Sequence, residues 1–422
     1  MIRLVPLHSF LVGVLCVVPT PWADAQGVQE AGTEVREVRT VQMSEEMYRR
    51  LTVVHELLGE NEVDEALTRL EALKRQNLNA DEEALIFQTE GFLHSQAGEY
   101  EFAIDAFRRS LERDVLSNLA HQSTLYSLAG LLASEGQFEE AVSSMLTWLR
   151  FAQEPVAADA YMLIGSSYLE LIQLDEALPY VQEAIRRAEA PSESWYRLEL
   201  SIHFEQIDYP SAAGLLRRMV VIWSDNARYW EMLASTYTEL EDDSSALATS
   251  MVAYKRGLVL DEARLLNLAR LNLYLDIPYE AAKLLETELS SGRISSDREA
   301  LDLLLSAWTA AREFDKAIGV IDELAPLTGD GGYYFQKARL LAEQADWSRV
   351  VEASDRALER AGIEQLGDAW ILKGMAHAEL GQYDAALAAF EEARLVDDSA
   401  QRNAEAWIEY VRDRRRVAAT RR

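Results

Sequence analysis

Histidine, cysteine and carboxylate side chains are the groups in this 422-residue sequence that could bind a metal or transfer a proton. No two of the six histidines form an HxxxH or HExxH motif, the spacing that presents two metal ligands on one face of a helix. They stand at His8, His55, His94, His121, His203 and His377. The sequence therefore predicts no metal site and no cofactor.

Motifs for phosphate binding and for a serine nucleophile are also missing from the sequence. Neither GxxxxGK[ST] nor GxGxxG follows a plausible strand, and Gly329–Gly332 is expected in a loop between two helical units. Gly165 begins Gly-Ser-Ser-Tyr rather than the GxSxG turn of a hydrolase. We predict no catalytic residue and expect that the protein is not an enzyme.

Aspartate and glutamate are abundant, with 71 residues against 41 lysines and arginines, and the formal net charge is −30. Adjacent acids such as Glu139 and Glu140 are expected in the first turns of helices, where they complement the helix dipole, or on solvated faces. An acidic surface repels the phosphate backbone whose counterion release drives nucleic-acid binding. Nucleic acid and anionic membranes are therefore not expected as partners.

The first 25 residues have the pattern of a secretory signal peptide. Arg3 precedes an apolar run over residues 10–18, and Ala23 and Ala25 provide a small-x-small cleavage site. Nine strongly apolar residues are too few to span a bilayer, which takes about 20 in a helix. Cleavage after Ala25 would remove Cys16, the single cysteine, and leave an exported chain with no stable membrane insertion and no disulfide.

A repeat of 33 to 38 residues occupies most of the remaining chain. Residues 26–42 have no helical stripe and are expected to form a flexible lead-in, and the repeats extend over residues 43–398. The clearest copies, at Ala103, Ala141 and Ala386, have a small residue in a first helix, a turn, an aromatic residue, the alanine three residues later, and an apolar residue four beyond that, and the other copies are weaker. The alanine position is held by Ala66, Ala103, Ala141, Ala177, Ala212, Ala246, Ala281, Ala317, Val350 and Ala386.

The landmarks of the repeat predict pairs of closely packed antiparallel helices. Small residues such as Gly91 and Ala103 allow two helices to approach, and the aromatic at the start of the second helix is expected to fill the gap between them. Gly98, Gly136 and Gly381 stand where a helix must end in a left-handed residue. Because one pair cannot cover its own apolar face, neighbouring pairs must stack and share a core.

The last segment, residues 399–422, differs from the repeats. Ala404, Trp407, Ile408 and Val411 form one apolar face, which predicts a helix that caps the final repeat. From Arg402 onward the net charge is +4, against −34 for the preceding chain. This basic tail is either solvated, or folds back on the acidic body, or holds an anionic partner. Its arginines are Arg412, Arg414, Arg415, Arg416, Arg421 and Arg422.

The repeated residues resemble the tetratricopeptide repeat (TPR). The resemblance is carried by Trp370, Gly374, Tyr383, Ala386, Phe390 and Ala393 in one copy, and by Phe87, Gly91, Gly98, Tyr100, Ala103 and Phe107 in another. It implies an all-α, right-handed superhelical solenoid of about ten TPR-like helix pairs with a C-terminal capping helix. An irregular helical bundle is the alternative.

In such a solenoid the first helices line a concave groove. We predict that this groove binds protein partners, because aromatic and Met side chains in a groove recognise peptides or helices. The inward positions are Gln88, Phe92, Tyr126, Met162, Tyr196, Leu200, Glu231, Asp302, Phe335, Arg339 and Ile371. Each of them could instead pack between neighbouring pairs. The Lys, Arg and Asn clamp by which chaperone-type TPRs hold a terminal carboxylate is not assembled at these positions.

The order of less usual segments also resembles an exported bacterial TPR family associated with the TonB, ExbB and ExbD system. These segments begin at Met43 (MSEEMY), Trp148 (WLR), Ser194 (SWYRL), Tyr229 (YWEMLA), Tyr254 (YKRGL) and Ile277 (IPYEAAKLL). The resemblance implies a periplasmic scaffold accessory to TonB-dependent transport, with Ton-system components as partners. The alternatives are an adaptor for outer-membrane or peptidoglycan assembly machinery, and an enzyme with a carboxylate site in the groove.

Overall fold

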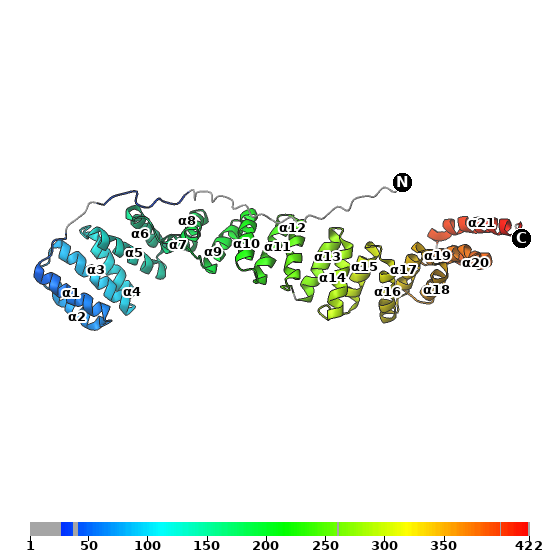
Figure 1. Ribbon diagram of the computed structural model, residues 1–422, viewed down its shortest axis with the longest axis horizontal. Coiled ribbons are helices and arrows are strands. Elements are labelled where there is room, and N and C mark those ends of the chain that lie inside the picture. The colour runs from blue at the N-terminus through cyan, green and yellow to red at the C-terminus, as the bar shows by residue number, and fades with distance from the viewer. Residues whose placement is uncertain (1–26, 37–40, 260, 397, 421–422) are drawn as a thin grey trace, which may run out of the picture. The chain divides into compact units, whose positions relative to one another are not determined.

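The computed structural model of the chain describes residues 27–36, 41–259, 261–396 and 398–420. These residues form 21 helices and no strand, so the prediction of an all-α repeat fold is confirmed (Figure 1). The first twenty helices form ten consecutive pairs, as the spacing of the landmarks predicts. The predicted signal peptide lies outside the described residues. In the described part of the chain, no helix is both long and apolar enough to cross a membrane.

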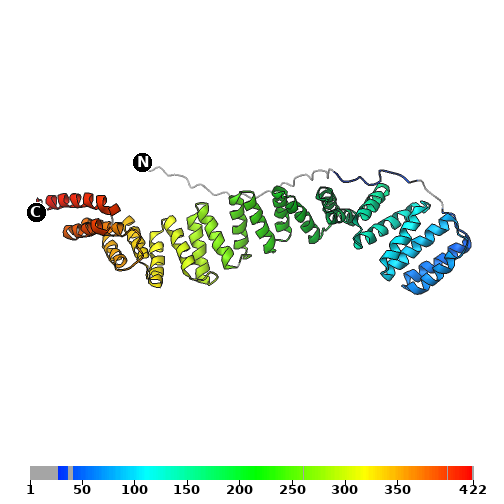
Figure 2. The same cartoon turned by 180° about the vertical axis from the view of Figure 1, so that it is seen from behind.

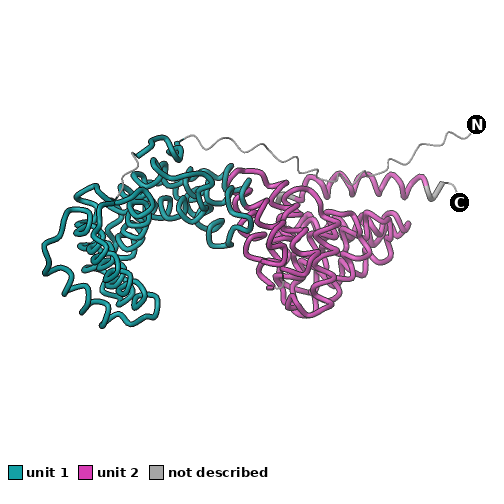
Figure 3. The backbone as a smooth tube through the Cα atoms, turned by 60° about the vertical axis from the view of Figure 1, so that its left-hand side comes forward, with its two compact units in different colours: residues 1–215 teal, residues 216–422 magenta. Residues whose placement is uncertain are grey.

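The chain divides into two compact units, residues 1–215 and 216–422 (Figure 3). Helix α10 spans the boundary between them. The helices of the first unit that precede it are α1 Glu45–Gly59, α2 Val63–Lys74, α3 Ala80–Ala97, α4 Tyr100–Glu112, α5 Asn118–Ser134, α6 Phe138–Phe151, α7 Ala158–Glu170, α8 Leu174–Arg187 and α9 Glu193–Glu205, and α10 itself is Tyr209–Ile222.

The second unit continues the same alternation of first and second helices. Its helices are α11 Ala227–Glu239, α12 Asp243–Lys255, α13 Glu262–Tyr274, α14 Pro278–Ser291, α15 Arg298–Ala310, α16 Phe314–Thr328, α17 Gly331–Glu343, α18 Trp347–Leu358, α19 Leu366–Glu379, α20 Tyr383–Val396 and α21 Asp398–Thr420.

The alanines of the second helices mark the packed interior of each pair. All ten residues at this position, including Val350, are at most 2% exposed. In α3, a Cβ added to Gly91 would lie 2.4 Å from the ring of Phe107 in α4, and one added to Gly374 would lie 2.6 Å from Phe390. The aromatic that fills the gap is therefore the residue four after the alanine. Tyr100, at the start of α4, is 40% exposed, so the prediction that this earlier aromatic fills the gap is wrong for that pair.

Every turn from a first helix to its second helix contains one residue with positive φ. Glycine occupies that place in three turns, at Gly98, Gly136 and Gly381, as predicted. The other seven turns adopt the same left-handed conformation without glycine, at Asn61, Ile172, Ile207, Glu241, Asp276, Arg312 and Ala345. The backbone of the turn is thus conserved along the chain although its residue is not.

Replacing Ile172 and Ile207 by glycine is expected to stabilise the protein. A residue with a Cβ in the left-handed conformation costs about 1–2 kcal/mol, and substitution by glycine removes this strain. Part of the stabilisation is offset because glycine has more conformational freedom in the unfolded chain. Both side chains are exposed, so little packing is lost. The double variant should raise the free energy of unfolding by about 1 kcal/mol, measured by urea denaturation. The variant with alanine at both positions keeps both Cβ atoms, so its free energy of unfolding should rise less. An equal rise in the two variants would show that the left-handed backbone is not strained by a Cβ.

Helix α21 packs on α19 and α20, beside which it runs in Figures 1 and 2. Ala404 and Val411 are fully buried and Ile408 is 6% exposed. The ring of Trp407 stacks on Phe390 at 5.8 Å. The last pair therefore has its apolar face covered by this helix.

Candidate functional site

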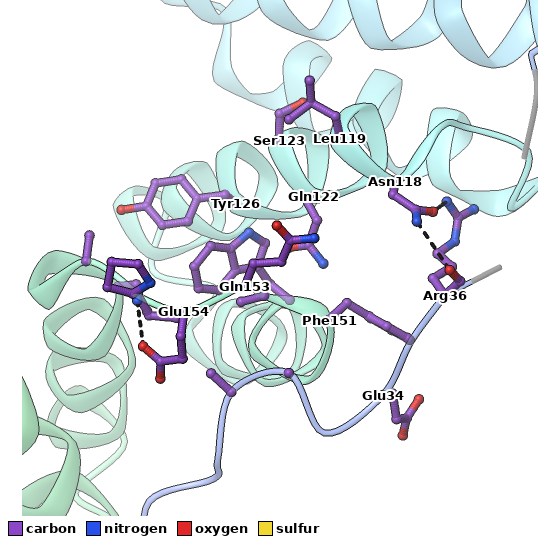
Figure 4. Close-up of a pocket in the computed structure, with 18 of the residues that line it drawn as sticks. Glu34, Arg36, Asn118, Leu119, Gln122, Ser123, Tyr126, Phe151, Gln153 and Glu154 are labelled. Carbon is purple, nitrogen blue, oxygen red and sulfur yellow. Dashed lines mark hydrogen bonds between the residues drawn. The ribbon is translucent and has the colours of Figure 1, made fainter. Parts of the chain in front are cut away.

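A pocket of about 1090 Å³ lies in the first unit, beside the N-terminal halves of α5 and α7. Its other walls are the end of α6, the loop over residues 152–157, and the segment over residues 31–36, which crosses the view in Figure 4. We call it the α5–α7 pocket. It is open to solvent and brings together residues more than 80 positions apart in the sequence.

The segment over residues 27–36 is held to the end of α6 by its backbone. The last carbonyls of a helix have no partner within the helix. Here the N–H of Gly32 donates to the carbonyl of Leu149 at 3.1 Å, and the N–H of Glu34 donates to that of Arg150 at 3.0 Å. At its other end the N–H of Gln29 donates to the Tyr180 hydroxyl at 3.2 Å.

Arg36 fastens the segment to the α4–α5 turn. Its Nη2 lies 2.5 Å from Oδ1 of Asp114, and its Nη1 donates to the carbonyl of Leu116 at 2.6 Å. Asn118 returns a bond from Nδ2 to the carbonyl of Arg36 at 3.2 Å (Figure 4). The Arg36 side chain is only 11% exposed. Residues 31–36, which belong to the expected lead-in, thus form one wall of the pocket; residues 37–40 lie outside the described part.

Aromatic side chains form the floor of the α5–α7 pocket. The rings of Tyr126 and Trp148 lie 5.4 Å apart, and the ring of Phe151 meets His121 edge to face at 6.4 Å. Burial raises the pKa of Tyr126, and the nearby carboxylate of Asp159 adds to the effect. The hydroxyl therefore stays protonated at neutral pH and can donate a hydrogen bond.

An unused hydrogen-bond acceptor lies in the same pocket. The Oε1 atom of Gln122 is buried and has no hydrogen-bond partner. A buried acceptor without a partner costs free energy. The pocket thus offers aromatic surface, and one of its lining side chains carries an unsatisfied buried acceptor.

One predicted groove residue of the first unit lines the α5–α7 pocket, and the others contact neighbouring side chains. Tyr126 is 37% exposed and lines the α5–α7 pocket, whereas Tyr196 and Leu200 are 6% and 3% exposed and pack between helices. Gln88 donates from Nε2 to Thr124 Oγ1 at 2.8 Å, and Phe92 meets Phe107 at 5.0 Å. Met162 is partly buried against the hydrophobic core.

The predicted groove residues of the second unit do not converge on a single site. Glu231 is paired with Arg264 at 2.7 Å and lines a smaller pocket of about 310 Å³. Asp302 accepts a hydrogen bond from the Tyr333 hydroxyl at 2.6 Å. The remaining positions differ in exposure: Phe335 is half-buried, Arg339 is exposed, and Ile371 is buried.

The described arginines of the basic tail belong to helix α21 and do not form a separate tail. Arg414 pairs with Glu379 at 3.1 Å and Arg415 pairs with Asp384 at 2.9 Å, so these arginines lie against the acidic α19–α20 pair. The two others in this helix also have acidic neighbours: Arg412 lies 3.9 Å from Glu391, and Arg416 pairs with Asp413. Arg421 and Arg422 lie outside the described residues.

Sequence reasoning missed the residues that the folded segment contributes to the pocket. Glu34 and Arg36 belong to no motif, and several of the bonds that hold the segment are made by backbone groups that every residue carries. Gly27 and Gly32, with φ of 121° and 68°, are the local signals of bends in this segment. Among the described residues, no group of three or more His, Cys, Asp or Glu side chains could hold a metal ion.

Acidification is expected to weaken the attachment of the segment through His121. Burial lowers the pKa of His121 below 6.5, and Arg36 lowers it further, while Asp114 opposes the shift. The neutral ring therefore stabilises the fold above about pH 6.5, and this contribution is lost as the pH falls through the folded-state pKa. Wild type should lose more unfolding free energy than His121→Gln between pH 7.5 and pH 5. Equal losses in chemical denaturation would contradict this.

Comparison with known proteins identifies the repeat. Family models of the tetratricopeptide repeat match residues 126–194, 163–227 and 367–393. Among the solved structures with a similar fold is YrrB, described as a TPR protein with an unusual peptide-binding site. It shares 20% identity with a TM-score of 0.33, over 41% of this chain and 85% of its own.

Two other solved structures are similar to parts of the chain at low identity. Naa15/Naa10 bound to HypK-THB shares 16% identity with a TM-score of 0.41, over 77% of this chain and 54% of its own. MamA from Desulfovibrio magneticus RS-1 shares 18% identity with a TM-score of 0.36, over 44% and 99%. No curated protein sequence matches the chain. The chain therefore contains tetratricopeptide repeats, at residues 126–227 and 367–393, within an all-α fold of stacked helix pairs.

Proposed function

We propose that the mature chain is a non-enzymatic scaffold of the periplasm that binds protein partners and assists TonB-dependent transport. Tetratricopeptide repeats generally mediate protein–protein interactions. The signal-peptide pattern of residues 1–25 supports export, and the order of segments from Met43 to Ile277 supports an association with the Ton system.

The α5–α7 pocket is the observation that carries the binding role. Its aromatic floor, which includes Tyr126 and Trp148, can hold an apolar side chain of a partner. The wall over residues 31–36 is already fastened at both ends, so binding would cost little ordering of the chain. These properties suit a short extended segment of a protein.

A pull-down with the purified mature chain tests both parts of the proposal. At physiological salt the chain should capture TonB, ExbB or ExbD from an envelope extract. Tyr126→Ala removes part of the aromatic floor and should reduce the amount captured at least fivefold. Ser143→Ala, an exposed position on α6 outside the pocket, is the matched control and should capture as wild type does.

The outcomes separate the two levels of the proposal. Capture of none of the three components would contradict the Ton assignment. Equal capture by the Tyr126→Ala variant would remove the pocket as the binding site. Export has its own measurement: N-terminal sequencing of the protein from a periplasmic fraction should begin at Gln26, and a chain that begins at Met1 would contradict export with cleavage.

A further inference from the structure

Two isoleucines project into solvent from neighbouring turns of the first unit. Ile172, between α7 and α8, is 81% exposed, and Ile207, between α9 and α10, is 69% exposed. Both hold the left-handed conformation, with φ of 58° and 56°. This combination is doubly unfavourable, because the backbone is strained and a large apolar side chain meets water.

The turn itself does not require isoleucine. The equivalent place in other turns is held by glycine or by small or polar residues, which are Asn61, Glu241, Asp276, Arg312 and Ala345. The two isoleucines are the β-branched residues at this position. Residues kept in strained backbone conformations concentrate at functional sites. The presence of isoleucine at these two positions is therefore better explained by a function than by the needs of the fold.

The two turns are physically joined. Gln206, the residue before Ile207, donates from Nε2 to Oδ1 of Asp175 at 2.7 Å, and Asp175 lies three residues after Ile172. Successive first-to-second turns lie on one edge of the stacked pairs. Both side chains therefore belong to one surface, which we call the isoleucine edge.

The isoleucine edge carries negative charge. Glu170, Asp175, Glu176 and Glu205 are exposed beside the two tips. The sequence has no lysine or arginine between residues 151 and 185, nor between 198 and 216. A partner that covers the isoleucines must therefore also bring positive charge.

We propose that the isoleucine edge binds a basic, amphipathic segment of a partner protein. The apolar side of that segment would cover Ile172 and Ile207, and its lysines or arginines would pair with the surrounding carboxylates. This surface is separate from the α5–α7 pocket, which lies at the N-terminal end of α7. The 13 residues of α7 place the two ends about 20 Å apart. The proposal does not depend on the role assigned to the pocket.

Binding of a designed peptide by the mature chain tests the proposal. The probe is a fluorescent 14-residue peptide with leucines on one helical face and lysines on the other, and its affinity is measured by fluorescence anisotropy. Ile172→Gly with Ile207→Gly leaves the charge of the protein unchanged and should weaken binding at least tenfold. Purely electrostatic attraction to an acidic protein would not respond to these substitutions.

A matched pair of substitutions controls for the relief of backbone strain. Glu241→Gly with Arg312→Gly also replaces two left-handed residues by glycine and keeps the net charge, but these residues are in the second unit. This variant should bind the peptide within twofold of wild type. The unfolding midpoint of the isoleucine variant should equal or exceed that of wild type, so that lost binding cannot reflect misfolding.

Several results would overturn the proposal. One is unchanged affinity in the isoleucine variant, and another is equal affinity of wild type for a peptide with glutamate in place of lysine. A fall in the unfolding midpoint would overturn the strain argument on which the proposal rests. The isoleucine variant could instead lose binding to uncharged phosphatidylcholine vesicles that wild type and the control variant bind, while its affinity for the peptide is unchanged. That result would assign Ile172 and Ile207 to a lipid surface.

Discussion

Phe107→Ala is expected to lower the free energy of unfolding by about 3–5 kcal/mol, the range for removing a buried phenylalanine. Phe107 is fully buried and its ring occupies the space over Gly91, where a Cβ would lie 2.4 Å from the ring. It also meets the ring of Phe92 edge to face at 5.0 Å. Truncation would leave a cavity in the centre of the α3–α4 pair.

The same helix provides the control for this prediction. Phe102 is also in α4 but is 65% exposed, so Phe102→Ala should change stability by no more than about 0.5 kcal/mol. Urea denaturation of both variants measures the difference. Equal losses would show that Phe107 does not hold the pair together.

The neighbouring pair suggests a compensating substitution. Ala129 and Met145 stand in α5 and α6 where Gly91 and Phe107 stand in α3 and α4. Gly91→Ala alone should be destabilising by about 1–3 kcal/mol, because the new methyl group collides with the ring. Adding Phe107→Met should recover most of that loss. A double variant no more stable than Gly91→Ala would contradict the equivalence of the two pairs.

Arg293→Ala is expected to cost about 3 kcal/mol in the second unit. The carboxylate of Glu288 is fully buried; its Oε2 lies 2.5 Å from Arg293 Nε, and its Oε1 accepts from the Tyr254 hydroxyl at 2.5 Å. Removing the arginine would leave a buried charge with only two neutral donors, the hydroxyls of Tyr254 and Ser291. The expected loss is at the lower end for buried pairs because the Arg293 side chain is itself 38% exposed.

A second substitution separates the loss of charge pairing from the loss of packing. Glu288→Gln in the Arg293→Ala background removes the unpaired charge and should restore part of the stability. Arg270→Ala breaks an exposed pair with Glu299, which is also 2.5 Å long, and should cost at most about 1 kcal/mol. Equal losses for Arg270→Ala and Arg293→Ala, measured by urea denaturation, would show that burial of Glu288 does not matter.

The repeat could be predicted from the sequence because its landmarks are set by close packing. An alanine such as Ala103 or Ala386 is required wherever two helices touch, and its recurrence is visible without a structure. The left-handed turns were predictable only where they contain glycine. Ile172 and Ile207 adopt the same backbone against their own preference, so no local signal marks them.

The candidate site was less accessible to sequence reasoning. Periodicity places Tyr126 and Tyr196 on equivalent first helices, yet Tyr126 is 37% exposed in the pocket and Tyr196 is buried. The difference depends on how neighbouring pairs pack, which the pattern within one repeat does not contain. The wall over residues 31–36 depends on backbone N–H groups that donate to the carbonyls of Leu149 and Arg150, and such bonds leave no trace in residue types.

We expect the α5–α7 pocket to hold a protein partner in the cell envelope. Site-specific photo-crosslinking in living cells measures this directly, with benzoylphenylalanine placed at Tyr126 in the pocket and at Ser143 on the exposed face of α6. We expect a discrete crosslinked protein from the Tyr126 position, identified by mass spectrometry as a Ton-system component, and none from Ser143. No adduct at Tyr126 above the level at Ser143 would contradict the claim.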